Sequence, residues 1–167
     1  MRVFVLIRAI VYATCFIAFL LIFVPTRLLD RSGIARPPGM GVPELLGATA
    51  ATVGALLALW CIFTFVFVGR GTPAPFDPPR RLVVRGPYRI VRNPMYLGAG
   101  FVLAGAAVIY HSLVLFGYLA LLAVIVQGMV VWYEEPTLTR LFGADYLRYR
   151  REVHRWLPQR PRGNLRG

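Results

Sequence analysis

The chain has 167 residues, of which 57% are hydrophobic, and its formal net charge is +12. This composition is too apolar for a soluble domain, so we predict a single membrane-embedded domain over residues 1–167. In a membrane protein the positive charge indicates anchoring to an anionic cytoplasmic leaflet, with membrane lipids rather than nucleic acid as partners. Cys15 and Cys61 lie inside apolar segments, where we expect neither a disulfide nor a metal site.

The first part of the chain contains two apolar segments, residues 3–24 and 44–68. Each is long enough to cross a bilayer core of about 30 Å as a helix. Pro25 predicts the end of the first segment and the start of a polar connection. Arg8, inside the first segment, could reach the interface or face the bundle interior. The second segment is rich in small residues that let membrane helices pack closely, namely Gly47, Ala50, Ala51, Gly54, Ala55 and Ala58.

No charged residue occurs from Pro94 to Tyr133. A single helix over this stretch would be about 60 Å long, roughly twice the thickness of the bilayer core. A turn at Tyr110-His111-Ser112 would divide the stretch into two spans, residues 94–110 and 112–133. We therefore predict a tight helical hairpin whose first arm is rich in glycine and alanine.

The last span ends at Glu134-Glu135-Pro136. Two adjacent acids at a helix C-terminus oppose the helix dipole, so the pair needs an explanation. Either both carboxylates are solvated beyond the membrane edge, or one is directed at a cation or at ligand hydroxyls. Leucines and tyrosines then recur at helical spacing opposite arginines, which predicts an amphipathic interfacial helix over about residues 136–155.

Arginine placement predicts the orientation of the chain in the membrane. Residues 69–92 contain six arginines and the C-terminal region eight, against three in the first connection and none at the hairpin turn. The positive-inside rule then places both termini and the long loop in the cytoplasm, and we expect a prokaryotic inner membrane. The predicted fold is all-α, with about four transmembrane helices and the C-terminal interfacial helix.

A candidate site lies where the long loop meets the hairpin. Asn93 followed by Pro94 predicts a helix start, with Asn93 as N-cap, and such a start attracts anions. Tyr96, Gly98 and Gly100 follow, and the glycines would let a ligand approach closely. The hairpin brings this helix start beside the acidic pair. Such a site suits a ligand carrying both signs of charge, either S-adenosylmethionine or the amino-acid substrate of a transporter.

The motif Gly-Pro-Tyr-Arg-x-Val-Arg-Asn-Pro-x-Tyr-x-Gly, followed by Glu-Glu and Leu-Phe-Gly-x-x-Tyr-x-x-Tyr, closely resembles the isoprenylcysteine carboxyl methyltransferase family. The wider group includes the phospholipid N-methyltransferases, whose Gly-x-Gly is similar to Gly98-Ala99-Gly100. The resemblance spans residues 82–158 and implies a membrane methyltransferase that binds S-adenosylmethionine at the cytoplasmic face. By position, it implies cofactor contacts at Leu82, Val83, Tyr88, Asn93, Pro94, Tyr96, Gly98, Gly100 and Glu134.

Two positions depart from the family pattern. Asn93 replaces the usual histidine, and an amide cannot carry a proton as an imidazole can. Val130 replaces the arginine that holds the substrate carboxylate in the prenylcysteine enzymes. We therefore expect a lipophilic amine or thiol, entering laterally from the bilayer, to be a better substrate than a prenylcysteine carboxylate. If an ammonium acceptor must first lose a proton, Tyr96 or Glu135 could assist as catalytic residues.

A non-catalytic reading of the sequence stays open. The same scaffold could serve as a four-helix membrane binding or assembly protein, and the replacement at Asn93 favours that alternative. A transporter is less consistent with the sequence, because the spans contain no ionisable residue near the midplane beyond Arg8, which is itself near the end of its segment.

Overall fold

The computed structural model describes residues 17–34, 39–64 and 82–158. Within these ranges every regular element is a helix and no strand occurs, which confirms the predicted all-α class. The elements are η1 (Phe19–Phe23), α2 (Val24–Arg31), α3 (Val42–Thr64), η3 (Gly86–Arg89), α4 (Pro94–Ile109), α5 (Leu113–Met129), η4 (Val130–Glu134) and α6 (Glu135–Glu152). Two helical stretches are long and apolar enough to cross a membrane, Val42–Thr64 and Leu113–Glu152, and α4 is a shorter apolar helix. The total of four spans stays a prediction.

Several predicted features fall outside the described residues. They are most of the first predicted span with Arg8 and Cys15, residues 65–68 of the second predicted span, residues 69–81 of the long loop, and residues 159–167 of the C-terminal region.

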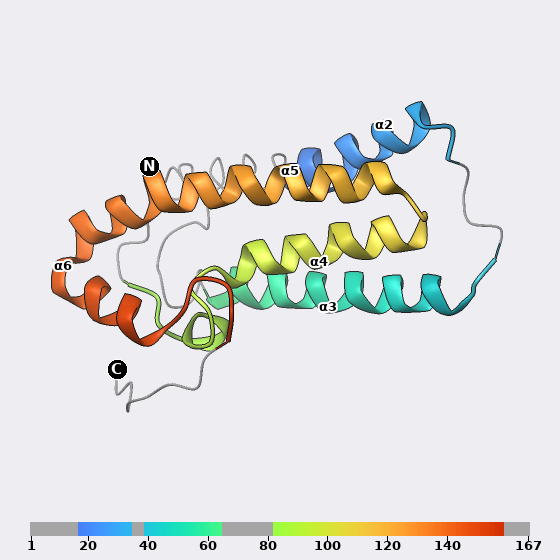
Figure 1. The fold of residues 1–167 in the computed structure, drawn as a ribbon. Coiled ribbons are helices and arrows are strands. Elements are labelled where there is room, and N and C mark those ends of the chain that lie inside the picture. Colours follow the sequence, from blue (N-terminus) through green and yellow to red (C-terminus); the bar gives the residue numbers. More distant parts are fainter. Residues whose placement is uncertain (1–16, 35–38, 65–81, 159–167) are drawn as a thin grey trace, which may run out of the picture.

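The closest helix contact joins α3 and α4, which run side by side (Figure 1). Two pairs of facing glycines make this possible. A Cβ added at Gly54 would stand 2.5 Å from the carbonyl oxygen of Gly98, and one added at Gly98 would stand 2.8 Å from that of Gly54. Gly47 and Gly105 form a second such pair about two helical turns away, with 2.7 Å from an added Cβ at Gly47 to the Gly105 oxygen. The predicted role of small residues in close packing is therefore confirmed.

Helices α4 and α5 form the predicted hairpin, with the turn at Tyr110–Ser112. His111 adopts a positive φ of 46° in this turn. Ser112 caps α5, because its hydroxyl accepts a hydrogen bond from the Leu115 backbone N–H at 3.3 Å. The His111 ring nitrogen Nε2 lies 2.7 Å from Glu44 Oε1, which ties the turn to the first turn of α3.

The end of the last span at Glu134-Glu135-Pro136 stays a prediction, but the helix itself does not stop there. The helix continues through Pro136, and it does so by forming one π-helical turn, in which the Glu135 N–H bonds to the Val130 carbonyl. Pro136 has no N–H to donate and would crowd the carbonyl four residues earlier, so a local widening accommodates it. The predicted amphipathic helix is present as α6, but it ends at Glu152 and is interrupted at Gly143, which has φ 52° and ψ −123°. There α6 changes direction and returns toward the start of α4 (Figure 1).

The first segment also continues further than predicted. Its helix runs through Pro25 to Arg31, because the π-turn η1 precedes Pro25, with the Val24 N–H bonded to the Phe19 carbonyl, much as η4 precedes Pro136. Leu29 of α2 is buried against Ala107 and Leu115, so this extension packs on the hairpin. The polar connection therefore begins after Arg31 rather than at Pro25.

Candidate functional site

The loop segment Leu82–Val84 contains the first residues expected at the candidate site. Its side chains alternate between two packed clusters. Leu82 and Val84 pack against Tyr146, Tyr149 and Val153 of the returning C-terminal segment. Val83 is buried on the other side, with Cys61 of α3 and Tyr88. Leu82 and Val83 are both expected to contact the cofactor. Leu82 is half-buried, and Val83 is almost fully enclosed by protein.

Tyr88, in η3, is a buried anchor of the loop. Burial raises the pKa of its phenol far above the usual range, so the side chain stays protonated. Its backbone carbonyl accepts a hydrogen bond of 2.6 Å from the Tyr149 hydroxyl, which joins the loop to α6. Gly86, just before it, has φ 58°, and an added Cβ would stand 2.9 Å from Thr64 Oγ1, so the loop needs glycine here.

Asn93 and Pro94 begin α4 at the predicted position. The predicted side-chain cap is wrong, because the Asn93 amide accepts no capping bond from the described first turn of α4. Its backbone carbonyl accepts from Leu97 N at 3.3 Å instead. Pro94 is fully buried and Asn93 is half-buried.

Tyr96 and Glu134 come together as predicted. The Tyr96 hydroxyl donates a hydrogen bond to Glu134 Oε1. This contact links the first turn of α4 with η4. The two elements are far apart in sequence, because α4 and α5 lie between them, but the hairpin brings them together in space. Both side chains are partly buried, and the functional role that we expect of each stays a prediction.

Glu135 occupies a different environment from its neighbour. Its side chain is only 9% exposed and is surrounded by three arginines. Glu135 Oε1 lies 3.0 Å from Arg92 Nη1 and 2.7 Å from Arg155 Nε, and Oε2 lies 3.9 Å from Arg150 Nη1. The reading of Glu135 as a solvated carboxylate is therefore wrong. Both oxygens of this carboxylate therefore face guanidinium groups.

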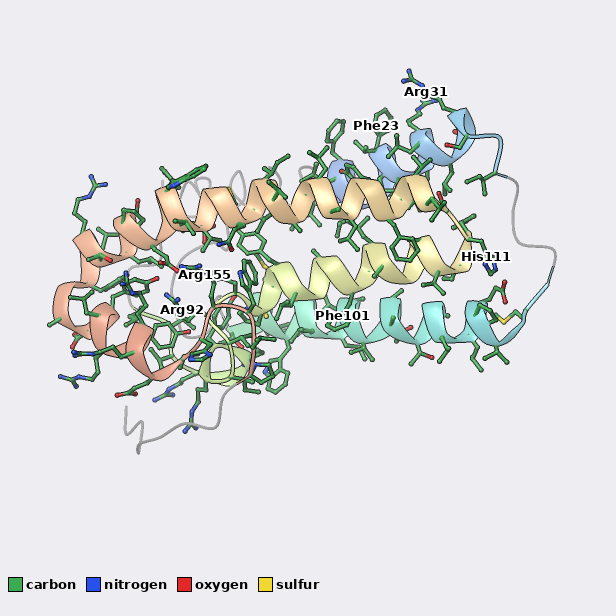
Figure 2. All side chains as sticks on the ribbon, in the orientation of Figure 1. Phe23, Arg31, Arg92, Phe101, His111 and Arg155 are labelled. Carbon is green, nitrogen blue, oxygen red and sulfur yellow. The ribbon has the colours of Figure 1, made fainter. Side chains whose placement is uncertain are left out.

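The three consecutive residues His154–Trp156, which we call the C-terminal strap, connect three parts of the site. The His154 carbonyl accepts from the Arg92 backbone N–H at 2.8 Å. Arg155 pairs with Glu135, and Trp156 Nε1 donates to Gln127 Oε1 of α5 at 2.8 Å. Figure 2 shows Arg92 and Arg155 close together, at the end of the molecule opposite His111.

Sequence reasoning missed the contribution of Arg92, Arg155 and the strap. Their signal was the acid pair itself, since a buried carboxylate needs cations and the nearest unassigned ones lay in the loop and the C-terminal region.

The two predicted glycine contacts differ. Gly98 packs on Gly54, so the α3–α4 contact explains its lack of a side chain, and its expected contact with the cofactor stays a prediction. Gly100 lies on another face of α4, where an added Cβ would have no described atom within 4 Å. Among the residues that the structure describes, no group of three His, Cys, Asp or Glu side chains could hold a metal ion.

The model of one protein family, described as phospholipid methyltransferase, matches residues 42–145, which is more than half of the chain. The match covers α3 to the first part of α6 and includes Tyr96, Glu134 and Glu135, whereas the strap lies beyond it. No curated protein and no solved structure matches the chain.

Proposed function

The chain belongs to the phospholipid methyltransferase family, and we propose that it transfers a methyl group from S-adenosylmethionine to a lipophilic or amphiphilic small molecule. We place it in a prokaryotic inner membrane, with its termini and the candidate site on the cytoplasmic side. Membership of a methyltransferase family supports the reaction class. The identity of the methyl donor and of the acceptor is our proposal.

The observation that carries this proposal is the contact between Tyr96 and Glu134 beside the start of α4. S-adenosylmethionine has a carboxylate, an ammonium, a sulfonium and ribose hydroxyls. The first turn of α4, which the Asn93 side chain leaves uncapped, suits the carboxylate. Glu134 suits the hydroxyls or the cationic part. One end of the hairpin thus offers partners for both signs of charge.

The described residues would act mainly by binding and alignment. A bound sulfonium donor would supply an electrophilic methyl carbon: the acceptor lone pair would form the new bond to that carbon as its bond to sulfur breaks, and the sulfur would leave as a neutral thioether. Holding donor and acceptor in line and excluding water are the protein's principal contributions to such a step. For an ammonium acceptor, Tyr96 remains the candidate for moving the proton, because its hydroxyl already bonds to the Glu134 carboxylate.

The acceptor we propose is an amine or a thiol attached to an apolar group. Val130, at the position of the carboxylate-binding arginine in the prenylcysteine enzymes, is 1% exposed and has no charge. Arg92, a loop arginine that could replace it, is paired with Glu135. A carboxylate in a low-dielectric site needs a paired cation, so a prenylcysteine carboxylate should be a poor substrate.

Calorimetric titration with S-adenosylmethionine and with its demethylated product tests the donor. Binding of both supports the proposal. Absence of binding by a folded protein would refute it and favour the non-catalytic membrane binding or assembly protein, a reading that the replacement of histidine by Asn93 supports. Parallel assays with labelled donor against a prenylcysteine analogue, a phosphatidylethanolamine and a hydrophobic thiol test the acceptor. Turnover of the prenylcysteine analogue alone would show that another arginine pairs with its carboxylate.

A further inference from the structure

One buried carboxylate connects the three segments that surround the candidate site. Glu135 contacts Arg92 at the end of the loop, Arg150 near the end of α6, and Arg155 in the strap. Arg92 lies two residues before Pro94 and also donates from Nη1 to the Tyr146 hydroxyl at 3.3 Å. The start of α4, the returning part of α6 and the strap therefore converge on a single side chain.

The acidic neighbours turn toward different partners. Glu134, the last residue of η4, accepts from Tyr96, and Glu135, the first residue of α6, faces the arginines. Because the two residues are adjacent in one helical backbone, fixing the side chain of Glu135 restricts rotation of the backbone that carries Glu134. Because Arg92 is adjacent to Asn93, the same ion pair fixes the loop from which α4 starts.

We propose that Glu135 is a positioning residue: through Arg92 and Arg155 it holds the start of α4 and the C-terminal strap so that Glu134 meets Tyr96. Glu135 does not touch the ligand and does not accept a proton during the reaction. The part of this proposal that concerns ligand affinity rests on the proposed function. The part that concerns the strap does not.

Stability alone is a weak explanation for this arrangement. A buried ion pair often contributes no more than apolar side chains of the same volume would, because both charges lose their hydration. Here one carboxylate serves three arginines, and Arg92 Nε is buried without a hydrogen-bond partner among the described residues. The cluster also lies where the two halves of the site meet, at the junction of η4 and α6. These features fit a role in positioning.

The test compares Glu135→Gln with Glu44→Gln in the full-length protein, purified in one detergent. Glu44 is a matched control, because its side chain is also largely enclosed and contacts a basic side chain, with 2.7 Å from Oε1 to His111 Nε2, but it lies at the opposite end of the bundle. The first measurement is the rate of trypsin cleavage between Arg155 and Trp156, followed by mass spectrometry. The second is the calorimetric affinity for the demethylated product of S-adenosylmethionine.

We expect Glu135→Gln to speed cleavage after Arg155 and to weaken affinity by about tenfold, the effect of about 1.4 kcal/mol. Glu44→Gln should leave both within about twofold of the wild type, and Glu135→Asp, which keeps the charge on a shorter side chain, should restore part of both. Should Glu135→Gln fail to fold, Glu135→Asp alone, judged against wild type, decides by the same two measurements.

Wild-type cleavage and wild-type affinity in the Glu135 variant would overturn the proposal. Equal changes in the Glu44 variant would also overturn it, because they would indicate a general loss of stability. If the wild type binds no ligand, the proposed function fails, and the cleavage rates alone then decide whether Glu135 holds the strap.

Discussion

Two neighbouring glutamates in this protein have unlike environments. Glu134 accepts a hydrogen bond from Tyr96, whereas Glu135 lies among three arginines. Because its carboxylate already contacts three arginines, we assign Glu135 a structural role. Glu134 keeps the capacity to accept further bonds, since a carboxylate has about four acceptor positions. The residue suited to bind a ligand is therefore Glu134.

Replacing Glu134 with glutamine should weaken binding of S-adenosylmethionine by roughly tenfold to a hundredfold. The variant keeps the shape of the side chain but loses a charge-assisted hydrogen bond, which typically contributes about 1.5–3 kcal/mol. Calorimetry with the purified protein measures the change, and Glu44→Gln serves as the control for loss of a carboxylate elsewhere. Equal affinities of wild type and Glu134→Gln would refute the assignment.

The two N-caps of the hairpin should respond differently to alanine. Ser112 is fully buried and its hydroxyl caps α5, so Ser112→Ala should lower the free energy of unfolding by about 1 kcal/mol. Asn93 makes no such bond within the described part of α4, so Asn93→Ala should change stability by a few tenths of that at most. Unfolding in mixed detergent micelles measures both. A loss at Asn93 as large as that at Ser112 would mean that the Asn93 amide does cap α4.

At the scale of whole elements, two local features shape the fold. The π-turn η4 lets a helix continue past Pro136, and the glycine pairs bring α3 against α4. The π-turn η4 determines the directions in which the side chains of Glu134 and Glu135 leave the helix. The second fixes α4, whose first turn holds Tyr96, against α3. Together, these two features determine where Tyr96 and Glu134 lie.

The glycine pairs predict a position-dependent effect of adding one methyl group. Gly54→Ala should destabilise the protein by about 1–3 kcal/mol, because its Cβ would stand 2.5 Å from the Gly98 carbonyl oxygen and the two backbones would have to separate. Gly117→Ala on α5 should be neutral or slightly stabilising, since no described atom lies within 4 Å of its added Cβ. Unfolding in mixed micelles distinguishes them. Equal stability of the two variants would contradict the close α3–α4 contact.

Across the whole molecule, the features that could be predicted are those with local causes. The start of α4 follows from Asn93-Pro94, and the hairpin turn follows from the length of the uncharged stretch. The convergence of Tyr96 and Glu134 followed from that hairpin. In contrast, the partners of Glu135 lie in segments distant in sequence, and no periodic pattern encodes such contacts. Nor did the sequence show that the helix would run on past Pro136, because a proline usually ends a helix, whereas here a π-turn accommodates it.

The orientation of the molecule in the membrane is the prediction that connects these scales. Arginines concentrate in residues 69–92 and in the C-terminal region, and the candidate site lies at the same end of the bundle as Arg92 and Arg155 (Figure 2). By the positive-inside rule this end should be cytoplasmic, with Ser32 and His111 on the other side.

Cysteine accessibility labelling in spheroplasts tests this orientation on a background lacking Cys15 and Cys61. A cysteine at Leu157, which is exposed, should react with an impermeant reagent only after the membrane is opened, whereas one at Ser32 should react in intact spheroplasts. Labelling of Leu157→Cys from outside would place the site on the opposite face. The methyl donor, which is made in the cytoplasm, could then not reach Glu134 directly, so the result would overturn both the topology and the proposed reaction.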